Sequence, residues 1–320
     1  MAMDKKFSYI FPGQGSQYLG MGSDLKDKFP YVKDLFLEAD DLMHYPLSKI
    51  MANGPLETLD DTEITQPAIF LHSIAVLYVI ESEFPNLKPF FLAGHSLGEI
   101  SALTAGKYLS FKNGMELVSK RGKLMKKAGK FANGGMAAII GLENEVLTTI
   151  CQMVSDENAS VQIANDNCPG QIVISGENNA LERAMKFAKE KGARIVKRLA
   201  VSIAAHSRLM EPIKEEFSEF VSNIEFSDDA AHPQVISNVT AKSLHSTAEI
   251  RKDLIDQLTS PVRWTSSIKN ILDQGCSHFI ELGPNKVLTG LMKRIERSAV
   301  CFSLGNTEDL QIFTQELNGI

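Results

Sequence analysis

The sequence of 320 residues has few of the features that mark secreted, membrane or nucleic-acid-binding proteins. Its 4 cysteines are scattered without the spacing of metal ligands, which suits reduced thiols in the cytoplasm. No apolar run approaches the roughly 18 residues of a membrane span, and residues 1–7 lack the apolar core of a signal peptide. The formal net charge of −6 argues against a general nucleic-acid binder, because phosphate contacts need a basic surface. We therefore expect a cytoplasmic globular protein with no membrane or nucleic acid among its partners.

Apolar runs bounded by turn residues alternate with longer segments of helical period along most of the chain. This alternation is typical of parallel strands joined by crossover helices. Examples of the expected strands are residues 9–11, 90–93, 235–237 and 278–282, and the expected helices include 68–84, 113–128, 212–221 and 287–296. The pattern predicts an α/β fold with a parallel sheet.

One stretch breaks this rhythm, because from residue 135 to about 197 the order is strand, helix, strand, strand, helix, strand. The six segments are 136–141, 145–154, 161–164, 172–175, 180–191 and 194–199. That order is typical of a ferredoxin-like unit. Since strand-like segments resume after it, we expect residues 130–198 to form a subdomain inserted into a large domain of residues 1–129 and 199–320. Substrates often bind in a cleft between two such units.

The strongest chemical signal is the sequence Gly94-His95-Ser96-Leu97-Gly98. It stands directly after an expected strand and before the helix-like segment 99–105. Small flanking residues allow a sharp strand-to-helix turn, which places the serine hydroxyl at the carboxyl edge of the sheet. Such a short pattern also occurs by chance, and a serine can simply cap a helix. The strand before it and the helix after it favour a nucleophile.

A serine nucleophile needs a base, and histidine is the usual one. His206 follows the strand-like segment 199–203, so it is expected at the same sheet edge as Ser96. His245 also follows a strand, several residues later in a polar loop, and is the second candidate. His278 and His232 stand at or before the starts of strands and should face the opposite edge. We expect His95 to support the turn.

Five motifs occur together in one order along the chain: FPGQGSQ at 11–17, GHSLGE at 94–99, RGKLM at 121–125, GMAAI at 135–139 and QLTSPVRW at 257–264. Together they resemble the malonyl-CoA:acyl carrier protein transacylase family of fatty acid and polyketide synthesis. The resemblance runs from about residue 7 to residue 304. It implies an α/β-hydrolase-like core with a parallel sheet and an inserted ferredoxin-like subdomain, in agreement with the pattern above.

The resemblance also implies a role for each matching residue. Ser96 resembles the nucleophile, His206 the general base and acid, and Gln257 the residue that orients the histidine without a carboxylate. Indeed, we find no convincing third Asp or Glu for a hydrolase triad. The backbone N–H groups of Gln14 and Leu97 match the oxyanion hole. The substrate-binding positions implied are Arg121, Gln14, Ala205, Gln66 and Asn165.

Two of these positions bear on the acyl group. Taken alone, Arg121 is one more cation of a lysine-rich helix, but the resemblance places it in the cleft, where a guanidinium would grip the free carboxylate of malonyl. Many malonyl-specific relatives have phenylalanine where Ala205 stands here, which leaves methylmalonyl as an alternative substrate. Leu97 resembles the malonyl type.

The implied activity is that of an [acyl-carrier-protein] S-malonyltransferase. Malonyl-CoA would be the donor, a phosphopantetheinylated acyl carrier protein the acceptor, and Ser96 the carrier of a covalent ester, with no bound cofactor or metal. We expect a monomer. An acidic carrier could dock on Lys286, Lys293, Arg294 and Arg297, or on Arg194, Lys197 and Arg198, although a solvated face explains either group equally well.

Three alternatives remain. An esterase or thioesterase shares the serine elbow, but it should show an acid and a C-terminal histidine. An acyl hydrolase of the same family, clearing stalled carrier proteins, often lacks the arginine that stands here at 121. A docking module without activity would be expected to lose the nucleophile or the base.

Overall fold

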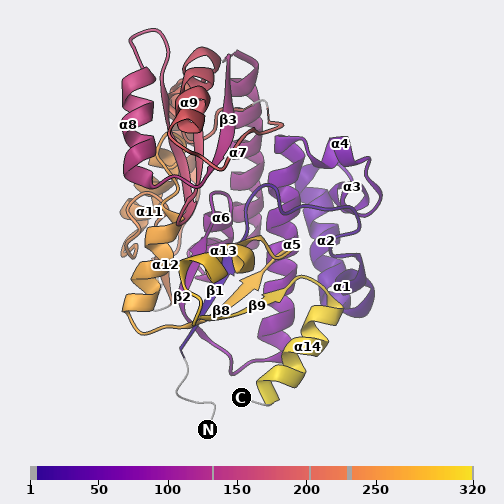
Figure 1. Cartoon of the computed structure of the whole chain (residues 1–320). Coiled ribbons are helices and arrows are strands. Elements are labelled where there is room, and N and C mark those ends of the chain that lie inside the picture. The colour runs from indigo at the N-terminus through magenta and orange to yellow at the C-terminus, as the bar shows by residue number, and fades with distance from the viewer. Residues whose placement is uncertain (1–5, 132, 202, 229–232, 319–320) are drawn as a thin grey trace.

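A parallel sheet lies at the centre of the larger part of the chain in the computed structural model (Figure 1). The structure describes residues 6–131, 133–201, 203–228 and 233–318. Within these residues the sheet has five strands in the order β7-β2-β1-β8-β9, and all neighbours pair in parallel. The strands are β1 (Phe7–Phe11), β2 (Pro89–Gly94), β7 (Gln234–Ile236), β8 (His278–Leu282) and β9 (Val300–Leu304).

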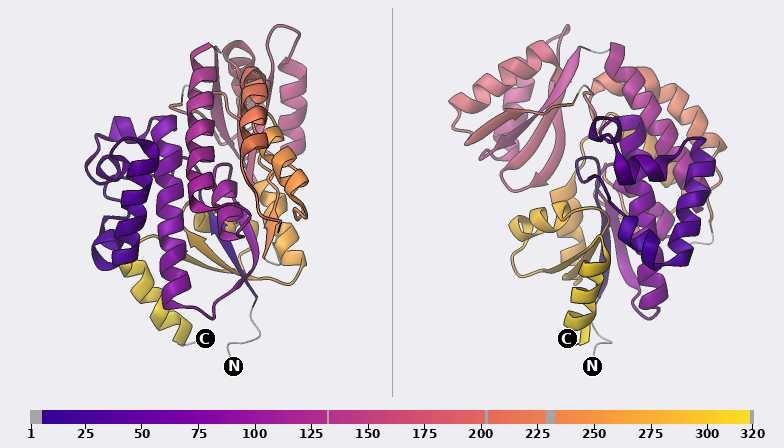
Figure 2. Two further views of the ribbon diagram at one scale, coloured as in Figure 1. Left: turned by 180° about the vertical axis from the view of Figure 1, so that it is seen from behind. Right: turned by 90° about the vertical axis from the view of Figure 1, so that its right-hand side faces the viewer.

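Helices cover both faces of this sheet (Figure 2). Along β1 the side chains alternate between two apolar cores, Tyr9 and Phe11 in one and Ile10 in the other, as the two-residue period of a strand requires. The helices of the larger part are α1 (Ser23–Lys28), α2 (Pro30–Met43), α3 (Leu47–Asn53), α4 (Leu56–Leu59), α5 (Thr62–Glu83), α6 (Gly98–Ala105), α7 (Phe111–Phe131), α10 (Glu211–Asn223), α11 (Thr247–Asp256), α12 (Trp264–Asp273), α13 (Val287–Ile295) and α14 (Thr307–Asn318).

A second, antiparallel sheet lies at the end of the molecule away from the two termini (Figure 1). Its described strands have the order β4-β5-β3-β6, and α8 (Asn144–Val154) and α9 (Asn178–Glu190) pack on one face. The other face carries Met136, Ala164 and Val173 and turns toward the larger part. The strands are β3 (Gly134–Ile140), β4 (Val161–Cys168), β5 (Gln171–Glu177) and β6 (Ile195–Arg198).

Helix α5 differs from the sequence expectation. By length and composition it is apolar enough to cross a membrane, whereas the sequence predicted no segment of that kind. Its apolar window is 83% buried inside the fold, mainly against α7 and the neighbouring helices. Packing on all sides explains this composition, because a fully covered core helix needs no polar face.

Candidate active site

Ser96 lies at a sharp turn between β2 and α6. Its φ of 54° falls in the left-handed region, which non-glycine residues seldom adopt. The flanking glycines make the turn possible. A Cβ on Gly94 would lie 1.9 Å from the carbonyl of Gly98, and a Cβ on Gly98 would lie 2.2 Å from the carbonyl oxygen of Phe11. The hydroxyl of Ser96 therefore stands at the carboxyl edge of the parallel sheet.

Side chains from distant segments hold this turn in place. The N–H of Ser96 donates to Asn238 Oδ1 at 2.8 Å, and Asn238 Nδ2 donates to the carbonyl of Gly94 at 2.7 Å. The ring of His95 lies beside the turn, with Nε2 2.8 Å from Asn167 Oδ1. The sequence predicted that His95 supports the turn, and its ring does lie beside the turn.

His206 faces the hydroxyl of Ser96. Its Nε2 lies 2.8 Å from Ser96 Oγ, and its Nδ1 lies 2.8 Å from the backbone carbonyl of Gln257. A carbonyl only accepts, so Nδ1 carries the proton and Nε2 is free to accept one. Burial, and then the positive charge of Arg121, lower the pKa of His206 to about 3. The imidazole is therefore neutral near pH 7, with Nε2 free to accept a hydrogen bond from the Ser96 hydroxyl.

The strand argument that pointed to His206 is wrong, although the residue does face Ser96. The described residues of 199–203 form no strand. Only the N–H of Leu199 continues the pairing beyond β6, and the chain then crosses back to the larger part along a cavity. The second candidate, His245, lines a cavity at the amino end of β2, opposite the Ser96 edge. His278 begins β8, and His232 lies outside the described residues.

Arg121 of α7 completes the cluster. Its side chain is 2% exposed, one Nη donates to Gln66 Oε1 at 2.9 Å, and the other donates to Ser96 Oγ at 3.0 Å and to Gln257 Oε1 at 2.9 Å. Its Nε has no hydrogen-bond partner among the described residues, and the acceptors of its other nitrogens are amide and hydroxyl oxygens. Burial lowers the pKa of Arg121 to about 10, so the group stays charged near pH 7. The site thus holds a buried cation without a contacting carboxylate.

Gln257, which follows α11, contacts all three of these groups. Its backbone carbonyl accepts from His206, its side-chain oxygen accepts from Arg121, and its Nε2 donates to the carbonyl of Ser96 at 3.1 Å. Orientation of the histidine thus uses a backbone oxygen, while the side chain of Gln257 serves the arginine.

A cavity of about 460 Å³ opens in front of Ser96, between the two sheets. Gln66 is not among its lining residues and lies behind Arg121. Within the described residues, no group of three His, Cys, Asp or Glu is placed to hold a metal ion. The other sequence-predicted positions that line the cavity are Gln14, Leu97, Asn165 and Ala205, joined by Met136 and Val173 of the antiparallel sheet.

The expected oxyanion hole consists of two backbone groups at the cavity wall. Within the part of the chain that the structure describes, the N–H groups of Gln14 and Leu97 donate to no other protein atom. The N–H of Leu97 stands at the amino end of α6, where the helix dipole favours negative charge. Both groups are available to a developing oxyanion.

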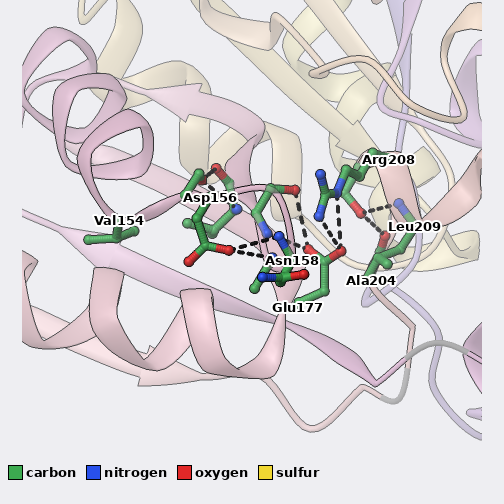
Figure 3. A network of polar contacts seen from close by, with 12 residues as sticks. Val154, Asp156, Asn158, Glu177, Ala204, Arg208 and Leu209 are labelled. Carbon is green, nitrogen blue, oxygen red and sulfur yellow. Dashed lines mark hydrogen bonds and ion pairs between the residues drawn. The ribbon is translucent and has the colours of Figure 1, made fainter.

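An ion pair connects the antiparallel sheet to the segment that carries His206. Arg208 Nη2 lies 2.9 Å from Glu177 Oε1 at the end of β5, and Figure 3 shows the two side chains meeting. Glu177 Oε2 also accepts from the N–H of Ser160 at 2.8 Å. The segment that follows His206 is thus tied to the end of β5 in the antiparallel sheet.

Sequence reasoning missed two buried residues of the site. Asn238 holds the turn, and Glu99 accepts from the N–H of Asn238 at 2.9 Å and from Gln257 Nε2. Nothing in the sequence around Asn238 indicates a role in the site. Glu99 could have been recognised, because it is an acidic residue in the short and otherwise uncharged helix α6, all of which is buried.

Comparison with known proteins identifies the family. The model of the acyl transferase domain family matches residues 8–314. A malonyl CoA-acyl carrier protein transacylase of Bacillus subtilis is 43% identical over 312 residues, which cover 98% of this chain and 97% of that protein. A protein of the same name from Haemophilus influenzae is 43% identical over 291 residues, 91% of this chain and 92% of its own.

Solved structures agree with these relatives. The malonyl CoA-acyl carrier protein transacylase of Coxiella burnetii superposes with a TM-score of 0.93 at 38% identity, over 98% of each chain. A malonyl-transacylase solved in complex with a type II PKS acyl-carrier protein superposes with a TM-score of 0.92 at 40% identity, over 98% of this chain and 100% of that one. Both sheets are thus those of known transacylase structures, and the chain belongs to the acyl transferase domain family as a member of the malonyl CoA-acyl carrier protein transacylases.

Proposed function

We propose that this chain is an [acyl-carrier-protein] S-malonyltransferase that carries malonyl as an ester on Ser96. The observation that supports this most is the meeting of three side chains at one cavity wall. Ser96 Oγ lies 2.8 Å from the imidazole of His206 and 3.0 Å from the guanidinium of Arg121. A nucleophile, a base and a cation for a carboxylate are the groups that malonyl transfer requires.

In the first step Ser96 attacks the thioester carbonyl of malonyl-CoA. His206 Nε2 takes the hydroxyl proton as the C–O bond forms, and the N–H groups of Gln14 and Leu97 hold the oxyanion. Collapse of the tetrahedral species breaks the C–S bond. The imidazolium returns the proton to the departing thiolate, and coenzyme A leaves.

The second step reverses the first with another thiol. The pantetheine thiol of an acyl carrier protein gives its proton to His206 and attacks the ester carbonyl. Ser96 leaves with that proton, and the malonyl group is now a thioester on the carrier. Serine, histidine and backbone groups supply the whole reaction, so no cofactor takes part.

Arg121 selects the acyl group through the free carboxylate of malonyl. A guanidinium forms two parallel hydrogen bonds with a carboxylate, and Arg121 is a buried cation without a contacting anion. The incoming negative charge also cancels part of the effect by which Arg121 lowers the pKa of His206. Malonyl therefore strengthens the base that activates Ser96, whereas acetyl does not.

Methylmalonyl is the second candidate substrate, because the small side chain of Ala205 lines the cavity and leaves room beside the acyl chain. Hydrolysis of acyl carriers is the second candidate reaction. The burial of Arg121 argues against it, because a hydrolase that clears diverse acyl groups has no use for a carboxylate ligand.

We also propose finer descriptions of the fold. The strand order β4-β5-β3-β6, with two helices on one face, supports a ferredoxin-like insert of residues 130–198. The parallel sheet and the serine turn after β2 support an α/β-hydrolase-like domain of residues 1–129 and 199–320. We expect a monomer in the cytoplasm, where its free cysteines would stay reduced.

Helix α13 is our choice for the carrier-docking face. Val287, Leu288 and Leu291 line the cavity, while Lys293 and Arg294 are exposed on the same helix. An acidic carrier held there would have its pantetheine arm at the cavity mouth. The second basic group, Arg194, Lys197 and Arg198, is also exposed, and Leu199 beside it lines the cavity.

To test this function, the protein is incubated with malonyl-CoA and with carrier protein that either bears or lacks phosphopantetheine. Mass spectrometry should find malonyl on the modified carrier, no malonyl on the unmodified one, and little free malonate. Free malonate forming at the same rate with either carrier would favour the hydrolase instead.

A further inference from the structure

Two carboxyl groups are buried together behind the active site. Glu99 of α6 is fully buried and Asp253 of α11 is 5% exposed. The carboxyl of Asp253 lies close enough to that of Glu99 to raise its pKa, and Asp253 Oδ2 has no hydrogen-bond donor among the described residues. Neither contacts the cavity, and the reaction steps above use neither. Two carboxyl groups cannot hydrogen-bond to each other unless one of them carries a proton.

The contacts of Gln257 fix the direction of its side-chain amide. Arg121 has only N–H groups to offer, so the Gln257 atom 2.9 Å from it must be the oxygen. The nitrogen of the same amide therefore points the other way, toward Glu99 Oε2 and the carbonyl of Ser96. Glu99 must accept a hydrogen bond at Oε2 for this orientation to hold.

The second oxygen of Glu99 reaches the serine turn. Oε1 accepts from the N–H of Asn238 at 2.9 Å, and Asn238 Oδ1 accepts from the N–H of Ser96 at 2.8 Å. One carboxyl group thus connects the segments that position Ser96, His206 and Arg121.

We propose that Glu99 is a positioning residue, which fixes the Gln257 amide so that its oxygen faces Arg121, and that Glu99 does so as half of a buried pair sharing one proton with Asp253. This role rests on the proposed malonyl transfer, which Glu99 and Asp253 would support from behind the site.

The surroundings of Asp253 agree with a shared proton. Its Oδ1 accepts from Ser237 Oγ, but its Oδ2 is buried and has no donor among the described residues. A proton on Glu99 supplies the missing donor. Burial, and then the charge of Asp253, raise the pKa of Glu99 well above its ordinary value, and burial raises the pKa of Asp253. The pair then carries one negative charge, opposite the buried cation of Arg121.

Two substitutions separate the roles of the pair. In Glu99→Gln, the new amide oxygen keeps the hydrogen bond from the N–H of Asn238, so the nitrogen takes the position of Oε2 and no longer accepts from Gln257. The Gln257 amide then turns, and Arg121 loses its oxygen. In Asp253→Asn, the new amide oxygen still accepts from Ser237 and the nitrogen donates to Glu99, so the orientation of Gln257 survives without a shared proton.

The experiment measures kcat/KM for malonyl-CoA and acetyl-CoA, together with the infrared band of a protonated carboxyl group in wild type and both variants. Glu99→Gln should lower the malonyl-to-acetyl ratio by roughly 10- to 100-fold, the effect of one lost hydrogen bond to a charged group. Asp253→Asn should keep the ratio. The wild-type band should be absent from both variants near neutral pH.

An unchanged ratio in Glu99→Gln, or equal losses for both substrates, would overturn the positioning role. A wild-type spectrum without the band would overturn the shared proton. If Glu99→Gln does not fold, the proposal is tested with Asp253→Asn alone. An unchanged malonyl-to-acetyl ratio together with loss of the infrared band supports the proposal, and persistence of the band contradicts it. Failure of the proposed function is distinct, since wild type itself would then not transfer malonyl.

Discussion

Arg121 donates to the hydroxyl oxygen of Ser96 across 3.0 Å, while the same oxygen lies 2.8 Å from His206 Nε2. The hydroxyl that we propose as the nucleophile therefore stands between a cation and a neutral imidazole. A cation at this distance favours the alkoxide that forms as the proton leaves. Under the proposed mechanism, pairing of the malonyl carboxylate with Arg121 would weaken the effect by which Arg121 lowers the pKa of His206, so His206 would become a stronger base.

Replacing Arg121 with alanine should lower kcat/KM for malonyl-CoA by two or more orders of magnitude relative to acetyl-CoA. The carboxylate would enter a buried site without a counter-charge, which costs about 3–5 kcal/mol. Parallel kinetics with both substrates measure the ratio. Lys123→Ala is the matched control, since Lys123 is an exposed cation of the same helix. Equal losses for the two substrates would show that Arg121 does not bind the malonyl carboxylate.

The acylation rate should not fall as the pH drops from neutral through 6.5, the ordinary pKa of histidine. A pKa lowered to about 3 keeps His206 unprotonated there, and the largest cause, burial, remains when malonyl neutralises Arg121. The charged and titratable groups that shift this pKa are Arg121 and His95. Single-turnover acylation followed by intact mass tests this. A rate that drops about tenfold per pH unit below 6.5 would show an ordinary histidine.

Gly98→Ala should destabilise the protein by about 1–3 kcal/mol and abolish transfer, because its Cβ would lie 2.2 Å from a backbone oxygen of Phe11. Gly290→Ala in α13 is the control, since nothing lies within 4 Å of its Cβ position. That change should stabilise the protein by roughly 0.5–1 kcal/mol and leave the acylation of Ser96 by malonyl-CoA intact, a step that does not involve the carrier-docking face. Thermal unfolding and acylation by malonyl-CoA are measured for both variants, and a stable, active Gly98→Ala would contradict the tight turn.

Ala205→Phe should reduce methylmalonyl transfer at least tenfold while malonyl transfer stays within about threefold. The larger side chain fills the cavity beside His206, and excluding one methyl group is worth about 1–3 kcal/mol. Competition between the two thioesters, analysed by mass spectrometry of the carrier, measures the preference. If methylmalonyl transfer is unaffected, Ala205 does not contact the acyl chain.

Much of the fold follows from local sequence patterns. The strands expected at 9–11, 90–93 and 278–282 lie within β1, β2 and β8, and the six segments of the antiparallel unit occur in the expected order. Strand β9 and helices α1 to α4, α11, α12 and α14 are not among the segments named from the sequence. The segment 199–203 looked like a strand because cavity-lining residues are as apolar as sheet residues.

The site was less predictable than the fold. The serine turn has a local signature of glycines, so Ser96 could be located from sequence. Glu99, Asp253 and Gln257 meet only through tertiary packing of α6 against the end of α11, and no spacing along the chain announces such a pair. Likewise, the sequence could not tell that His206 is hydrogen-bonded to the backbone carbonyl of Gln257 and not to its side chain.

The most direct test of the account is peptide mapping of the protein after brief exposure to malonyl-CoA, in wild type, Ser96→Ala and His206→Ala. We predict one malonyl group per chain on Ser96 of the wild type, lost when phosphopantetheinylated carrier is added, with none on Ser96→Ala and far slower labelling of His206→Ala. Malonyl found on another residue, or equal labelling of Ser96→Ala, would contradict the central claim that the hydroxyl held by His206 and Arg121 carries the acyl group.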